Sequence, residues 1–248
     1  MSPGLFRYLA VILLFTDFGS SDPYVGQVRL VLQRAAPGVP VVDLLNDLPP
    51  FQVRPAAQLL AALAAWMEPG DVALAVVDPG VGTPRAAVAI NSRGRWFVGP
   101  DNGLLSVVAA RDGCDGIWHL PTPPHPISAT FHGRDVFAPI AAHLALRTDS
   151  VPTLEPTRLT IDFGAADLAE VIFVDHYGNA MTGLRNVPPN AVFTVGGVPL
   201  PQARTFADVP VGRAAWIINS LGLVEIVVNE GSAARLLSLR VGDPIAWS

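Results

Sequence analysis

The hydrophobic pattern of this chain changes character part-way along its length. In the first half, short β-branched or aromatic runs alternate with stretches that carry apolar residues at helical spacing. The runs are bounded by Gly, Pro, Asn and Asp, so they predict strands buried on both faces, over residues 11–15, 39–42, 72–77, 87–90 and 96–98. Helices are predicted over residues 24–36, 54–67, 104–111 and 136–146. The alternation predicts an N-terminal α/β domain with a mostly parallel sheet.

The second half of the chain has a different pattern, because the helical stretches fade from about residue 151. Short strand-like runs separated by Gly-rich turns replace them, over residues 171–174, 191–195, 215–219, 223–228 and 244–247. This pattern is typical of a small antiparallel barrel or sandwich. We therefore expect an α/β domain at residues 1–150, a linker at 151–165 and a smaller β domain at 166–248.

Charge and cysteine content exclude several classes of function. All sixteen basic residues are arginine and the net charge is −5, so we expect no nucleic-acid partner. Without lysine there is no Schiff-base chemistry and no phosphate-binding lysine. The single cysteine, Cys114, cannot form an internal disulfide, and we expect a cytoplasmic protein. The apolar run at residues 5–15 is too short to span a bilayer, so no membrane partner is expected.

Four aspartates follow predicted strands: Asp17, Asp43 and Asp78 come at the strand ends, and Asp101 comes after a Gly-Pro turn. Each one alone is explained as well by a helix cap or a turn as by a ligand. Ligands bind parallel sheets beyond the carboxyl ends of the strands, and four carboxylates there would concentrate negative charge. A cationic or hydroxyl-rich ligand would suit such an edge.

Two loops carry the other candidate residues. The loop at residues 77–85 contains two glycines and two prolines, with Asp78 at its start and Arg85 at its end, so these two side chains can pair across its mouth. Such a pair can equally be a purely structural salt bridge. In the second loop, His132 stands just before a predicted helix, where a lone histidine is more often structural. No histidine spacing indicates a zinc site, and we expect no metal.

Six segments, taken in order, resemble one known family. They are residues 16–19, 78–85, 100–103, 130–135, 175–179 and 219–220, the last accompanied by Glu225 and Asn229. Together they are similar to the S-adenosyl-L-methionine (SAM) hydroxide adenosyltransferases, relatives of the bacterial fluorinase and chlorinase. The resemblance implies an N-terminal α/β domain, a C-terminal β-barrel, and a homotrimer. It also implies a ligand held between the N-terminal domain of one subunit and the C-terminal domain of the next.

The resemblance also assigns roles to individual residues. It places Asp78, Arg85 and His132 around the attacked carbon and Asp17 on the ribose. It implies substrate binding by Asp22, Phe51, Phe131, Gly133, Asp175, Tyr177, Asn179, Phe206, Ser220, Glu225 and Val228. The halogenases have a tyrosine in place of Asp78, a threonine in place of Val81, and a tyrosine followed by serine or glycine in place of His132 and Gly133. These differences favour water over halide as the nucleophile. The halogenases also have arginines near Leu221 and Val228, so the contacts with the methionine carboxylate and the adenine must differ here.

The implied reaction is attack of water or hydroxide on the ribose 5′ carbon of SAM, which gives adenosine and L-methionine. SAM is the substrate, and no cofactor is needed. Three alternatives stay open at this point. The chain can be a halide-dependent adenosyltransferase, a non-catalytic module that binds SAM or adenosine, or a protein in which Asp78, Arg85 and His132 only support the fold.

Overall fold

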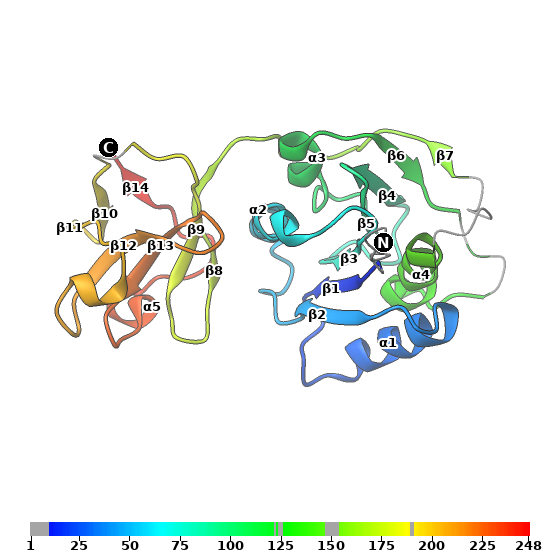
Figure 1. The fold of residues 1–248 in the computed structure, drawn as a ribbon, viewed down its shortest axis with the longest axis horizontal. Coiled ribbons are helices and arrows are strands. Elements are labelled where there is room, and N and C mark those ends of the chain that lie inside the picture. The colour runs from blue at the N-terminus through cyan, green and yellow to red at the C-terminus, as the bar shows by residue number, and fades with distance from the viewer. Residues whose placement is uncertain (1–9, 122, 124–125, 147–153, 189–190) are drawn as a thin grey trace, which may run out of the picture.

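A seven-stranded sheet forms the core of the N-terminal part, in the order β2-β1-β3-β5-β4-β6-β7 (Figure 1). The computed structural model describes residues 10–121, 123, 126–146, 154–188 and 191–248. The strands are β1 (Ile12–Thr16), β2 (Val41–Leu45), β3 (Val72–Val76), β4 (Ala87–Ser92), β5 (Arg95–Pro100), β6 (Gly116–His119) and β7 (Glu155–Pro156). Strands β2, β1, β3 and β5 are parallel, whereas β4, β6 and β7 pair antiparallel with their neighbours. The predicted α/β architecture with a largely parallel sheet is confirmed.

Helices cover both faces of this sheet, because its central strands are apolar on both sides (Figure 1). On one face, Ile12 and Leu74 pack against α1 (Pro23–Ala35) and α4 (Ala138–Leu146). On the other, Phe15 and Ala73 pack against α2 (Val53–Leu63) and α3 (Ser106–Asp112). A short 3₁₀ turn, η1 (Ala64–Trp66), continues α2. The wide turn η2 (Gly133–Phe137) precedes α4, so the predicted helix at 136–146 begins earlier and in another geometry.

One strand prediction was wrong in its burial. Strand β2 was expected to be buried on both faces, but it lies at the edge of the sheet, and two of its five residues are exposed. Its run of valines and leucines resembles that of a central strand. The sequence does not reveal which strand lies at the edge of the sheet, so the burial of this strand was predicted incorrectly. Its position near the edge also decides the fate of Asp43, described below.

The C-terminal part consists of two antiparallel sheets. The larger has the order β12-β13-β9-β8 and the smaller β11-β10-β14. The strands are β8 (Leu168–Val174), β9 (Ala180–Gly183), β10 (Phe193–Val195), β11 (Val198–Leu200), β12 (Ala214–Ile218), β13 (Val224–Val228) and β14 (Ala246–Trp247), with the short helices η3 (Phe206–Asp208) and α5 (Ala233–Leu236). The two sheets share one core, in which Phe193 and Trp216 pack together. The antiparallel arrangement is confirmed, and the barrel expected from the resemblance stays a prediction.

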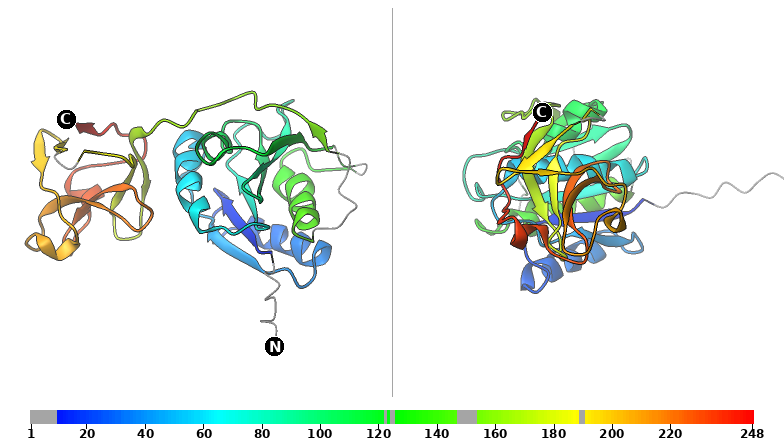
Figure 2. Two further views of the ribbon diagram at one scale, coloured as in Figure 1. Left: turned by 45° about the horizontal axis from the view of Figure 1, so that its top comes forward. Right: turned by 90° about the vertical axis from the view of Figure 1, so that its left-hand side faces the viewer.

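The two parts lie side by side and touch through α2 and β8 (Figure 2). The Gln58 side chain donates to the Ala166 carbonyl at 3.0 Å, and Arg185 Nη2 donates to the Gln58 carbonyl at 2.7 Å. An ion pair of 2.6 Å joins Arg111 to Asp167. Burial lowers the pKa of Arg185 to about 10. In the part of the chain that the structure describes, no helix is long and apolar enough to cross a membrane.

Candidate active site

Two aspartates meet at the carboxyl ends of neighbouring parallel strands. Asp17 follows β1 and Asp78 lies just beyond β3, which pairs with β1 in register. Both line a cavity of about 260 Å³, together with the aromatic rings of Phe18 and Phe131 and the side chain of His132. The sheet therefore places two carboxylates in one cavity, as the strand-end argument predicted for this pair.

The other two strand-end aspartates are used elsewhere, so the expectation of four carboxylates on one edge was wrong. Asp43 lies within β2 rather than after it, and it pairs with Arg29 at 2.6 Å on the exposed surface. Asp101 is buried and accepts hydrogen bonds from the backbone N–H and the hydroxyl of Thr160. Asp101 thereby fixes the segment that follows β7 against the N-terminal sheet.

A buried set of three side chains connects the two predicted loops. Arg85 Nε donates to Asp78 Oδ1 at 2.8 Å, and Arg85 Nη2 donates to Asp78 Oδ2. The same Nη2 lies 3.1 Å from His132 Nδ1, and Arg85 Nη1 donates to the Ala86 carbonyl at 3.2 Å. The side chains of Arg85 and Asp78 are only 10% and 4% exposed. The predicted pairing across the loop mouth is confirmed, and His132 joins it.

The contact with Arg85 determines the tautomer of His132. A guanidinium has only donors, so His132 Nδ1 must accept, and the proton of the neutral ring is on Nε2. Burial lowers the pKa of His132, and the nearby Arg85 charge lowers it further. At neutral pH the ring therefore offers an N–H donor at Nε2.

The three side chains face two different cavities. Asp78 and His132 line the 260 Å³ cavity with Asp17, whereas Arg85 lines a second cavity of about 340 Å³ behind it. His132 borders both, and His119 lines only the second. A molecule in the first cavity therefore meets Asp78 and His132 directly, while Arg85 acts on it through them.

Aromatic rings form one wall of the first cavity. The rings of Phe18, Tyr24 and Phe131 make mutual edge-to-face contacts at centroid distances of 5.4–6.4 Å. Phe131 was expected to bind substrate, whereas Phe18 and Tyr24 were missed. Phe18 belongs to the segment 16–19 used for the resemblance, which is a signal that could have found it. Tyr24 gave no signal beyond its position near the start of a helix.

Asp17 holds Phe51, at the rim of this cavity, in an unusual backbone conformation. Its Oδ2 accepts from the backbone N–H of Phe51 at 3.1 Å, and Phe51 has a φ of 66°, which a residue with a side chain rarely adopts. The Phe51 side chain is 71% exposed and lines the cavity with Asp22 and Gly133. Burial raises the pKa of Asp17.

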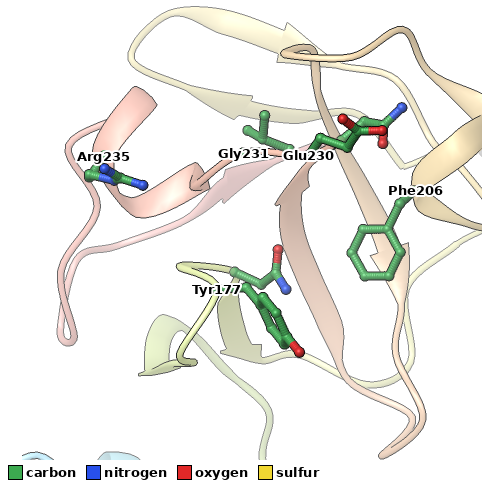
Figure 3. Close-up of a pocket in the computed structure, with 8 residues that line it drawn as sticks. Tyr177, Phe206, Glu230, Gly231 and Arg235 are labelled. Atoms are coloured by element: carbon green, nitrogen blue, oxygen red, sulfur yellow. The ribbon is translucent and has the colours of Figure 1, made fainter.

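The C-terminal part has a larger cavity of about 630 Å³ (Figure 3). Four expected residues line it, namely Tyr177, Asn179, Phe206 and Val228. Four further residues there were not expected to bind substrate, namely Asn229, Glu230, Gly231 and Arg235. Figure 3 shows the ring of Tyr177, from the turn after β8, and the ring of Phe206, from η3, projecting toward the same space. Among the described residues, none lines both this cavity and the one around Asp17.

Three further expected residues line neither of these cavities: Asp175, Ser220 and Glu225. Asp175 supports the turn after β8, because it accepts from the backbone and side-chain nitrogens of Asn179. Glu225 is buried in β13 beside Asn219, and burial raises its pKa. No group of three or more His, Cys, Asp or Glu side chains within the described ranges is arranged to hold a metal ion.

Comparison with known proteins decides the family. The model of the SAM hydroxide adenosyltransferase N-terminal domain matches residues 12–153, and that of the C-terminal domain matches residues 169–246. The chain belongs to the SAM hydroxide adenosyltransferase family. The two matched regions correspond to the two parts of the fold; the first contains the cavity around Asp17 and the second contains the 630 Å³ cavity.

Relatives within the SAM hydroxide adenosyltransferases share most of the chain. A protein of Thermus thermophilus named (R)-S-adenosyl-L-methionine hydrolase is 43% identical, over 94% of this chain and 98% of its own. One with the same name from Salinispora arenicola is 42% identical, over 93% and 94%. A fluorinase of Actinopolyspora mzabensis is 25% identical, over 94% and 95%. A solved structure from Thermotoga maritima has a TM-score of 0.85 at 32% identity, covering 95% of this chain and 98% of that chain.

Proposed function

We propose that this protein hydrolyses SAM to adenosine and L-methionine by attack of water on the ribose 5′ carbon. The observation that carries the proposal is the buried set of Asp78, Arg85 and His132, which borders a cavity that also contains Asp17 and aromatic rings. The hydrolase names of relatives that are 40–43% identical support the same reaction.

The cavity suits a sulfonium ion. Asp17 and Asp78 provide negative charge, and the Phe18 ring, which lines the same cavity, can interact with a cation. Phe131 lines the cavity too, but Arg134 Cζ lies over its ring, 5.2 Å from the centroid. A sulfonium leaves as a neutral thioether, so the leaving group needs no general acid. No negative charge develops on a carbonyl or phosphoryl group, and the reaction that we propose uses no cofactor and no metal.

The geometry suggests a role for each polar side chain. His132 Nε2–H donates to the oxygen of the water, and Asp78 accepts one of its protons. The C–O bond forms as the C–S bond breaks, with the bonding pair leaving on sulfur. The attacking water becomes more acidic as the C–O bond forms, so a carboxylate is basic enough to accept its proton. The proton then returns to solvent. Arg85 holds both partners in place, and Asp17 binds the ribose hydroxyls.

We infer that the complete site forms between two subunits of a homotrimer. The expected substrate residues divide between two cavities that share no described lining residue. At their rims, Phe51, Tyr177 and Phe206 are 71%, 75% and 41% exposed, which is unusual for aromatic side chains in a completed binding site. A head-to-tail ring would place the N-terminal cavity of one subunit against the C-terminal cavity of the next.

The direct test is incubation of the purified protein with each sulfur epimer of SAM, followed by chromatography. We expect adenosine and L-methionine in equal amounts, with the (R) epimer preferred, as the names of the relatives indicate. Adenosine at the level of the no-enzyme control would overturn the proposal. Formation of 5′-halo-5′-deoxyadenosine with added chloride or fluoride would indicate a halogenase, and tight binding without turnover would indicate a binding module.

Two cavity side chains predict the pH dependence of hydrolysis. Asp17 loses its charge at a higher pH than an ordinary aspartate because burial raises its pKa, so KM should rise as the pH falls through that range. His132 stays neutral below the ordinary histidine pKa of about 6.5. Protonation of Nδ1 removes the acceptor for Arg85 Nη2 and disrupts the set, so kcat should fall only at that lower pH. Profiles of kcat and KM against pH check both. A kcat already declining with acid above pH 7 would contradict the role of His132.

Gly133 predicts a substitution that acts on substrate binding. A Cβ at this position would lie 2.7 Å from Phe18 Cζ, so Gly133→Ala must displace the Phe18 ring. Overpacking of this kind costs about 1–3 kcal/mol of folding stability. If the displaced ring weakens substrate binding by about 1.4 kcal/mol, KM rises roughly 10-fold. Gly26→Ala in α1 is the control, because no heavy atom lies within 4 Å of its added Cβ. Equal KM values for the two variants would show that the Phe18 ring does not shape the cavity.

A further inference from the structure

The helix that carries His132 begins with a widened turn. In η2 (Gly133–Phe137), the backbone N–H of Ala138 donates to the Gly133 carbonyl, a bond that spans five residues instead of four. His132 immediately precedes this turn and Phe137 ends it. Such π-helical turns are uncommon and occur frequently at functional sites.

Both ends of this turn contact the same guanidinium. Arg85 Nη2 lies 3.1 Å from His132 Nδ1, and Arg85 Cζ lies 5.3 Å from the centroid of the Phe137 ring. In a regular α-helix, residues five apart point in directions about 140° apart. The widened turn changes this relation, and it brings the imidazole and the phenyl ring onto one partner.

The surroundings of Arg85 show why a second contact matters. One side of the residue borders the 340 Å³ cavity, so close packing does not restrain it there. Phe137 is fully buried and packs among the residues between the sheet and α4. The ring therefore provides a rigid face on which the guanidinium rests while its N–H groups reach Asp78 and His132.

We propose that Phe137 is a positioning residue for the hydrolysis, because its ring face holds Arg85 where it binds Asp78 and His132 simultaneously. This inference rests on the proposed function. Phe137 does not touch the substrate cavity, so its effect passes through Arg85. Loss of the ring face should lower kcat and leave KM nearly unchanged.

The test compares Phe137→Met with Phe97→Met in the full-length protein. Phe97 lies in β5 and is as buried as Phe137, but it belongs to the core on the opposite face of the sheet. Phe137→Met should lower kcat about 10-fold, within the range of a desolvated cation–π contact. The charged groups near His132 are Arg85, Asp78 and Asp135, and burial and the Arg85 charge together lower the pKa of His132. A more mobile Arg85 would admit water to His132 and raise that pKa. The fall of kcat at acid pH should therefore begin at a higher pH in Phe137→Met. Phe97→Met should lower the melting temperature with neither change.

A second substitution keeps the shape of the ring and changes only its charge distribution. Pentafluorophenylalanine at position 137 reverses the polarity of the ring face, so kcat should fall as in Phe137→Met. If the position 137 variants retain wild-type kcat and pH profile, the inference is wrong while the proposed function stands. If the wild-type protein forms no adenosine, the proposed function itself fails.

Discussion

Replacing Asp78 by asparagine is expected to lower kcat for SAM hydrolysis by roughly 10²–10⁴-fold, the usual contribution of a positioned proton acceptor. The amide keeps the size of the carboxylate and one acceptor oxygen, but it cannot take a proton from water. It also presents an N–H group toward Arg85, whose Nε and Nη2 both donate to Asp78. Steady-state kinetics on the purified variant measure the effect.

A second ion pair in the same half of the protein provides the matched control. Arg95 pairs with Asp112 at 2.6 Å, and its side chain is as buried as that of Arg85, but neither residue lines the substrate cavity. Asp112→Asn should lower the melting temperature and leave kcat unchanged. Comparable losses of kcat in both variants would mean that the Asp78–Arg85 pair matters only for the fold, the structural alternative left open by the sequence.

Mixing two inactive variants is expected to restore activity if neighbouring subunits share the site. One variant carries Asp78→Asn in its N-terminal part, and the other carries Tyr177→Ala with Phe206→Ala in its C-terminal part. The two are co-expressed with different affinity tags and purified through both tags. Each mixed ring then contains one interface with both halves intact, so about a third of wild-type activity should return.

The outcome separates two arrangements of the site. If the two cavities of one subunit act together, every site in the mixed oligomer carries a defect, and no activity returns. A protein that stays monomeric by light scattering would also contradict the trimer. Tyr177 and Phe206 are exposed at the rim of their cavity, so their replacement should leave folding intact.

Much of the N-terminal site could be predicted because it depends on local sequence signals. Asp17 and Asp78 follow apolar strands directly, and parallel strands bring such residues to one edge. Arg85 and Asp78 are only seven positions apart, and the loop that joins them contains two glycines and two prolines. In the C-terminal part, several short strands were identified at nearly their observed positions.

What the sequence did not reveal depends on contacts between distant residues. Asp101 is bound by Thr160, which lies 59 residues further along the chain. Asp43 is separated from the cavity because β2 lies at the edge of the sheet, a matter of strand order rather than composition. The cluster of Phe18 and Tyr24 with Phe131 depends on how α1 approaches the second loop. The π-helical turn reflects a one-residue change in backbone hydrogen bonding, for which the sequence gives no periodic signal.

In the reaction that we propose, water attacks the ribose 5′ carbon and the carbon–sulfur bond breaks. Hydrolysis of SAM in H₂¹⁸O, followed by mass spectrometry of both products, tests it directly. We expect one heavy oxygen in adenosine at the 5′ position and none in L-methionine. Adenosine without the label would show that its new oxygen does not come from water, and methylthioadenosine with labelled homoserine would show that the other carbon–sulfur bond is attacked; either result would contradict attack by water on the ribose carbon.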